Sequence, residues 1–300
     1  MPHLKANGVE LFYEDHGQPG DPAILLIMGL GTQLIAWPDD FVAQLVDRGF
    51  RVIRFDNRDI GLSTHLDGAS ARHPLWALIA LRMGLPFKPA YTLTDMAADA
   101  VALLDGLGIA RAHVVGASMG GMIAQLVAAH WPDRVLSLTS IMSSSGAPGL
   151  PGPTRELRRV LMMRRPVDPT RDEAIAAGAK VLSMISFPDP ARAPNAFSVA
   201  AAIAYDRDFH PLGTRRQLLA ILADGSRVDR LATISAPALV VHGGADPLIP
   251  AAAGRDTARH IKGARFELVM EMAHDLPPSQ TTRLVALIAD HAAAHGGTTI

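Results

Sequence analysis

The sequence contains no cysteine, which excludes disulfides, cysteine-based zinc sites and a thiol nucleophile. It also lacks an excess of charge of one sign, since the formal net charge is −1. This balance argues against a nucleic-acid surface or a polybasic membrane patch. No apolar run approaches the roughly 20 residues that a membrane-spanning helix needs, so we expect no membrane insertion. No signal peptide is evident in the first residues, and we therefore expect a cytoplasmic protein.

Apolar residues make up 49% of the 300 positions, enough to build a large core. Strand-like and helix-like segments alternate along most of the chain, which predicts an α/β fold with a mostly parallel central sheet flanked by helices. Residues 9–14 are expected as an antiparallel edge strand. The other expected strands are 23–28, 51–55, 112–115, 135–142, 238–242 and 265–270. The expected helices are 41–48, one capped by Thr94 and running to 107, 119–130, 251–261 and 277–294.

The pattern changes after residue 145. Residues 147–153 are rich in proline and glycine, which is typical of a turn-rich linker. Residues 154–225 have helical periodicity but no convincing strand. We therefore expect a core formed by residues 1–145 and 227–300, with a helical cap, residues 146–226, inserted between late strands.

The central motif is Gly116-Ala117-Ser118-Met119-Gly120, placed between a strand and a helix. A serine at such a turn occupies a strained backbone conformation with its hydroxyl projecting from the sheet, and the flanking glycines allow close approach of the chains. We predict that Ser118 is a catalytic nucleophile. The alternative is that Ser118 only turns the chain.

A serine nucleophile needs a base, and the base needs an orienting acid. In a strand–elbow–helix scaffold the chain order is nucleophile, acid, histidine. Asp246 follows a buried strand and two glycines, and His274 lies in the loop after the last strand. We assign Asp246 as the orienter and His274 as the general base. Alternatively, Asp246 is a turn former or helix cap, and His274 a polar loop residue.

The other acids and histidines fit these roles less well. Asp275 is a poorer acid because the side chains of adjacent residues diverge, and His242 lies within a strand. His260, His291 and His295 are expected on helices that face solvent. No histidines pair at a spacing that demands a metal, and we therefore expect no metal site.

Acyl transfer also needs donors for the developing oxyanion. The backbone N–H of Met119, directly after the nucleophile, is one candidate. The backbone N–H of Leu30, flanked by Gly29 and Gly31, is the other, unless this loop is an ordinary glycine-rich turn. Residues 56–63 are expected to fix the walls of the site, with a direct substrate role for Arg58 as an alternative.

Several apolar side chains are candidates for lining a substrate pocket, although each could instead belong to the core. They are Trp37, Met162, Met163, Met184, Phe187 and Phe197. Methionine adapts to varied apolar shapes. A pocket lined by these residues would take an apolar, uncharged acyl or alcohol group.

Together these features resemble the α/β-hydrolase superfamily, over essentially the whole chain outside the cap. The residues that carry the resemblance are the loop 28–31, the run 56–63, the Ser118 elbow, Asp246 and His274. Residues 37–41 and 56–63 are most similar to the aclacinomycin methylesterase branch of serine esterases. Many relatives have histidine where Met28 stands, but a backbone donor in the oxyanion loop survives that change.

The resemblance implies cofactor-independent hydrolysis of small-molecule carboxylic esters through an acyl-enzyme intermediate. Other uses of the same site remain alternatives: lactone opening, C–C bond cleavage of a diketone, or perhydrolysis. A ligand-binding receptor of the same fold with little turnover is an alternative from a different class.

Overall fold

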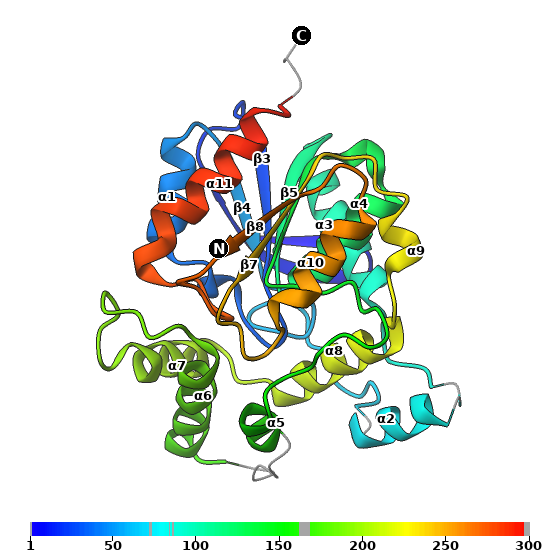
Figure 1. Ribbon diagram of the computed structural model, residues 1–300, viewed down its shortest axis with the longest axis vertical. Coiled ribbons are helices and arrows are strands. Elements are labelled where there is room, and N and C mark those ends of the chain that lie inside the picture. The colour runs from blue at the N-terminus through cyan, green and yellow to red at the C-terminus, as the bar shows by residue number, and fades with distance from the viewer. Residues whose placement is uncertain (1, 72–73, 84, 86, 162–168, 297–300) are drawn as a thin grey trace.

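The computed structural model describes residues 2–71, 74–83, 85, 87–161 and 169–296. At its centre lies an eight-stranded sheet with the strand order β1-β2-β4-β3-β5-β6-β7-β8 (Figure 1). The six strands from β4 to β8 in this order are parallel. At the other side of β4, β2 pairs antiparallel with β4 and β1 pairs antiparallel with β2. The strands are β1 His3–Ala6, β2 Val9–His16, β3 Ala23–Ile27, β4 Arg51–Phe55, β5 Ala112–Ala117, β6 Val135–Ile141, β7 Ala238–Gly243 and β8 Arg265–Val269.

Helices cover both faces of the sheet (Figure 1). On one face lie α1 (Asp39–Asp47) and α11 (Thr281–Ala293), and on the other lie α3 (Leu93–Gly106), α4 (Met119–His130) and α10 (Ala251–His260). Strands β3, β5 and β7 are buried along their whole length, as expected for strands covered on both faces. The expected α/β architecture is confirmed.

Several further elements are short. They are α2 (Pro74–Arg82), α9 (Val228–Leu231) and the 3-10 turns Leu34–Ala36, Pro132–Arg134 and Pro278–Gln280. The first of them, α2, packs against the later helix α8 (Pro211–Asp224). Among the described residues, no helix combines the length and the apolar character that a membrane span requires.

Four of the five described helices between β6 and β7 lie together beyond one end of the sheet (Figure 1). They are α5 (Arg155–Leu161), α6 (Arg171–Ile185), α7 (Ala196–Arg207) and α8 (Pro211–Asp224). We call residues 155–224 the helical segment. It contacts the loops that leave the carboxyl ends of β3 and β4. Gln217 of α8 accepts a hydrogen bond from the Gly31 N–H, and Arg207 of α7 forms an ion pair with Asp56. The described residues of the segment contain no strand.

Two expected details of the secondary structure are wrong. The segment expected as an edge strand is β2, which is interior, because β1 pairs with its outer side. A hairpin turn at Asn7 and Gly8, with φ of 48° and 79°, folds β1 back onto β2. The helix expected to be capped by Thr94 begins at Leu93 instead. Its cap is Thr92, whose side chain and that of Asp95 form a reciprocal capping box.

His291 was expected to face solvent, but it is 6% exposed because α11 packs this side against the core. Burial lowers the pKa of His291 to about 4. It does the same for His113, which is buried in β5 with its Nδ1 2.9 Å from the Ser137 hydroxyl. Both side chains therefore stay neutral in the folded protein at pH values where they are protonated in the unfolded chain.

We predict that acid destabilises the fold through these two histidines. Below pH ~6.5 both histidines become protonated in the unfolded chain but stay neutral in the folded protein. The free energy of unfolding therefore falls by about 1.4 kcal/mol per pH unit for each histidine, down to pH ~4. Urea unfolding between pH 7 and pH 5 measures this slope. His291→Gln should reduce it, while the same change at the exposed His130 should leave it unchanged. If the free energy of unfolding fell equally steeply with pH in the wild type and in both variants, the prediction would be contradicted.

Candidate active site

Ser118 lies at a sharp turn between β5 and α4, with φ 56° and ψ −118°. A positive φ is strained for a non-glycine residue, and here the Ser118 N–H donating to Ile141 O (2.9 Å) helps to hold it. A Cβ on Gly116 would lie 2.0 Å from Gly120 O, and one on Gly120 would lie 2.0 Å from Ile27 O. Glycine is therefore required at both positions for α4 to leave the sheet so abruptly, and this is the geometry of a nucleophile elbow.

His274 joins Ser118 to Asp246. Its Nε2 is 2.9 Å from Ser118 Oγ, and its Nδ1 is 2.8 Å from Asp246 Oδ2. Asp246 follows β7 and His274 follows β8, so the parallel order of the strands brings both to the edge of the sheet where β5 ends. The structure thus assembles the three residues that the sequence analysis chose, in the expected order.

Asp246 is held as a carboxylate. Its Oδ1 accepts the backbone N–H groups of Leu248 (2.9 Å) and Ile249 (2.8 Å). Burial acts to raise the pKa of Asp246, but hydrogen bonds from His242, His274 and Ile249 outweigh it and bring this pKa to about 2. An ionised Asp246 accepts the Nδ1–H of His274, which leaves Nε2 free to accept a proton from Ser118.

The loop after β3 passes close to Ser118. A Cβ on Gly29 would lie 3.1 Å from Ser118 Cβ, so glycine permits this approach. Met119 is the first residue of α4, and its N–H therefore has no acceptor in its own helix. The Leu30 N–H likewise has no protein acceptor within the part of the chain that the structure describes. Within the described chain, neither predicted oxyanion donor has a protein acceptor, and each belongs to a residue next to Ser118 or next to Gly29, which lies close to Ser118.

Residues 56–63 connect the core to the helical segment. Asp56 accepts the Leu34 N–H (2.7 Å) and pairs with Arg207 of α7 (2.8 Å). Asp59 accepts two hydrogen bonds from Arg216 of α8, each 2.7 Å. Arg58, for which a substrate role was the alternative, is buried and engaged by Asp99. The charged groups of this run are therefore occupied in holding loops and helices together.

The helical segment also contacts the loop that carries His274. The His274 N–H donates to Ile185 O (2.8 Å) at the end of α6. Asp275, the alternative acid, accepts the Phe187 N–H (3.2 Å) and pairs with Arg192 (2.5 Å). Asp275 is thus engaged by the helical segment, while Asp246 is the acid that contacts the histidine ring.

The candidate pocket residues fall into three groups. Met184 and Phe187 are partly buried on either side of Ile185, next to His274, and the Phe197 ring lies 4.9 Å from the Arg192 guanidinium. Trp37 is fully buried and packs against Phe41 in the core between the sheet, α1 and α11. Met162 and Met163 lie outside the described residues.

His242 and Gln217 are close to the site but were not assigned a role from the sequence. His242 is buried in β7, with Nε2 2.7 Å from Ile249 O and 3.4 Å from Asp246 Oδ2. Gln217, on α8, is buried and accepts the Gly31 N–H (2.9 Å). The strand position of His242 indicated burial, but no local pattern signals a contact between residues as distant as 31 and 217.

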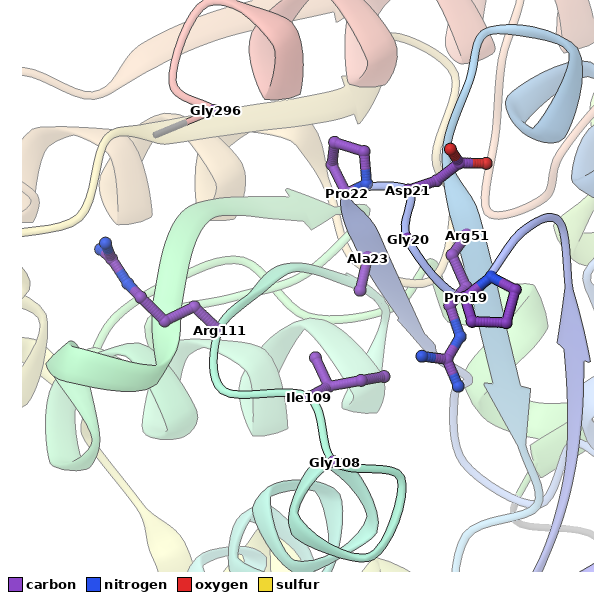
Figure 2. A pocket seen from close by; sticks show the side chains of 10 residues that line it. All are labelled: Pro19, Gly20, Asp21, Pro22, Ala23, Arg51, Gly108, Ile109, Arg111 and Gly296. Atoms are coloured by element: carbon purple, nitrogen blue, oxygen red, sulfur yellow. The ribbon is translucent and has the colours of Figure 1, made fainter. Parts of the chain in front are cut away.

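A hollow of about 200 Å³ lies at the end of the sheet opposite to the triad, where the parallel strands begin. Figure 2 shows Pro22, Ala23, Arg51 and Arg111 around it, at the amino ends of β3, β4 and β5. Ser118 follows the carboxyl end of β5, so this hollow is separate from the triad. Within the described ranges, no group of three or more His, Asp or Glu side chains could hold a metal ion.

The elbow serine, its histidine and acid, and the parallel sheet that presents them define a hydrolase of the α/β class. The chain belongs to the α/β hydrolase fold family, which matches residues 22–277. It is 31% identical to rhodomycin D methylesterase DnrP from Streptomyces peucetius, over 95% of this chain and 96% of that protein. The resemblance to the methylesterase branch is confirmed.

Lactonases are also among the relatives. The chain is 27% identical to 3-oxoadipate enol-lactonase 2 from Acinetobacter baylyi, over 90% of this chain and 88% of that protein. The crystal structure of an enol-lactonase from Burkholderia xenovorans superposes with a TM-score of 0.72 at 26% identity, covering 97% of this chain and all of that one.

Proposed function

We propose that this protein is a cofactor-independent serine hydrolase that cleaves carboxylic esters of apolar, uncharged small molecules. The observation that carries the proposal is the continuous chain of contacts from Ser118 Oγ through the His274 ring to the Asp246 carboxylate. The methylesterase relatives support esters, and methyl esters in particular, as the substrates to test. The proposed location is the cytoplasm.

In the proposed mechanism, His274 Nε2 takes the proton of Ser118 as Oγ attacks the ester carbonyl. The backbone N–H groups of Leu30 and Met119 stabilise the oxyanion, and Asp246 stabilises the imidazolium. His274 then gives its proton to the leaving alkoxide, and the acyl group stays on Ser118. A water molecule, deprotonated by His274, attacks the acyl-enzyme, and the acid leaves as Ser118 recovers its proton.

We further propose that residues 146–226 form a cap over this site, set on the core formed by residues 1–145 and 227–300. The contacts of α7 and α8 with the loops after β3 and β4, and of the segment after α6 with the His274 loop, support this arrangement. Met184, Phe187 and Phe197 are the described cap residues that we expect to contact the acyl or alcohol group.

Turnover of purified protein on methyl and p-nitrophenyl esters tests the proposal, together with labelling by a fluorophosphonate probe. Lactone opening is the second candidate, because enol-lactonases are among the relatives that the chain matches over most of its length. A lactone panel run beside the esters ranks the two activities by kcat/KM. A protein that neither labels nor hydrolyses any of these compounds would contradict both and favour a binding protein.

The proposed mechanism predicts a simple pH dependence. With a pKa of about 2, Asp246 stays ionised from pH 5 to pH 9, so a loss of activity in acid within this range does not come from Asp246. Protonated His274 cannot accept the serine proton, and kcat/KM for a non-ionising ester should therefore fall with acid, tenfold per pH unit at the limit. The profile is measured where circular dichroism shows a folded protein. A flat profile would contradict a histidine base.

A further inference from the structure

The loop 28–32 presents Leu30 between two glycines, a sequence that leaves its peptide groups free to rotate. An oxyanion donor is effective only if its N–H already points at the place where negative charge develops. The loop backbone supplies one long hydrogen bond, from the Thr32 N–H to Gly29 O at 3.4 Å, so side chains are needed to hold these peptide groups firmly. The following inference rests on the proposed function and concerns the residues that hold them.

Thr32 holds the peptide that contains the Leu30 N–H, chiefly through its side chain. Because a trans peptide is planar, the Gly29 carbonyl and the Leu30 N–H point in opposite directions. The Thr32 hydroxyl donates to Gly29 O at 2.9 Å, and the Thr32 N–H approaches the same oxygen at 3.4 Å. Holding the carbonyl on the Thr32 side therefore turns the Leu30 N–H to the opposite side.

The two neighbouring peptides are each held by another side chain. In the peptide before, Met28 O accepts the Asn57 amide N–H at 3.0 Å. In the peptide after, the Gly31 N–H donates to Gln217 Oε1 at 2.9 Å. Gln217 is fully buried, and its Nε2 donates to Arg58 O at 2.9 Å, so its amide cannot turn without losing both bonds.

We propose that Thr32 and Gln217 are positioning residues, which orient the Leu30 N–H for the oxyanion without touching the substrate. Thr32 holds the Gly29–Leu30 peptide, which contains the donor N–H. Gln217, on α8, holds the next peptide, Leu30–Gly31. Since the oxyanion exists only in the tetrahedral states, loss of this orientation lowers kcat and leaves ester binding nearly unchanged.

Thr32→Val tests the inference, because valine keeps the shape and removes the hydroxyl. We expect kcat to fall about tenfold with KM within twofold of wild type, a smaller loss than the roughly 10²–10³ seen when an oxyanion donor is removed outright. Affinity for a trifluoromethyl ketone, which forms a tetrahedral oxyanion on the serine, should weaken by a similar factor. Thr32→Ser keeps the hydroxyl and should return kcat to within about twofold of wild type.

Thr233→Val is the matched control. The Thr233 hydroxyl also donates to the carbonyl three residues earlier, Arg230 O at 2.8 Å, but it lies before β7, at the opposite end of the sheet from Ser118. This variant should keep wild-type kcat. Gln217→Met gives a second, independent measurement and should also lower kcat more than it changes KM.

The outcomes separate the two proposals. Wild-type kcat in both Thr32→Val and Gln217→Met, in an active parent enzyme, would overturn the positioning roles and leave the esterase proposal intact. A raised KM with unchanged kcat would also overturn them, because it indicates substrate binding. A parent enzyme with no hydrolysis or labelling would overturn the proposed function itself, and the positioning roles with it.

Discussion

Ser118→Ala should lower ester turnover by about four to six orders of magnitude while the protein remains folded. Alanine offers no nucleophile to the carbonyl carbon, and His274 Nε2 loses its hydrogen-bonding partner at 2.9 Å. Alanine adopts the φ of 56° with a strain similar to that of serine, so the thermal midpoint should change little.

Initial rates on a p-nitrophenyl ester and fluorophosphonate labelling measure the effect of Ser118→Ala, with circular dichroism as the check on folding. Ser183→Ala, at an exposed position of α6, is the control and should keep full turnover and labelling. If Ser118→Ala retained more than about a tenth of wild-type turnover, a barrier change below ~1.4 kcal/mol, the serine would not be the nucleophile.

Asp246→Asn should lower kcat by about four orders of magnitude. The backbone N–H groups of Leu248 and Ile249 both donate to Oδ1, so the amide oxygen of asparagine takes that position and its NH2 faces His274. His274 Nδ1 must then accept that N–H, and the ring carries its proton on Nε2. In this tautomer the histidine cannot accept the proton of Ser118.

Asp275→Asn is the matched control for Asp246→Asn, because it makes the same change at the neighbouring acid. Asp275 forms an ion pair with Arg192. Loss of this ion pair should lower kcat by less than about tenfold, since the contact of Asp246 with the histidine ring is kept. Steady-state rates of both variants on the same ester decide between the acids. A near-normal Asp246→Asn beside an inactive Asp275→Asn would reverse the assignment.

The features that could be predicted from the sequence are those encoded locally. The buried parallel strands appear as continuous apolar runs, and the elbow appears as glycines on both sides of Ser118, because each conformation depends on neighbours in the chain. Chain order then sufficed to select Asp246 and His274 from among the acids and histidines, since parallel strands deliver their following loops to one edge of the sheet.

The features that could not be predicted depend on contacts between distant segments. Gln217 and Gly31 are 186 positions apart, and nothing near either residue indicates their hydrogen bond. The burial of His291 likewise depends on which side of α11 meets the core. The outer strand β1 is a different case. Asn7-Gly8 is a recognisable hairpin signal, but the four residues of β1 are too few to show a strand pattern of their own.

The contacts between residues 185–192 and the His274 loop limit how this enzyme can be re-engineered. Ile185 O accepts the His274 N–H, and Arg192 neutralises Asp275, so both partners leave when the helices between β6 and β7 are exchanged for those of a relative. A chimera built for a new substrate would therefore have an unpaired N–H and a carboxylate without its arginine next to its base. Grafts that retain residues 185–192 keep these contacts, and the seam of an exchange belongs outside this stretch.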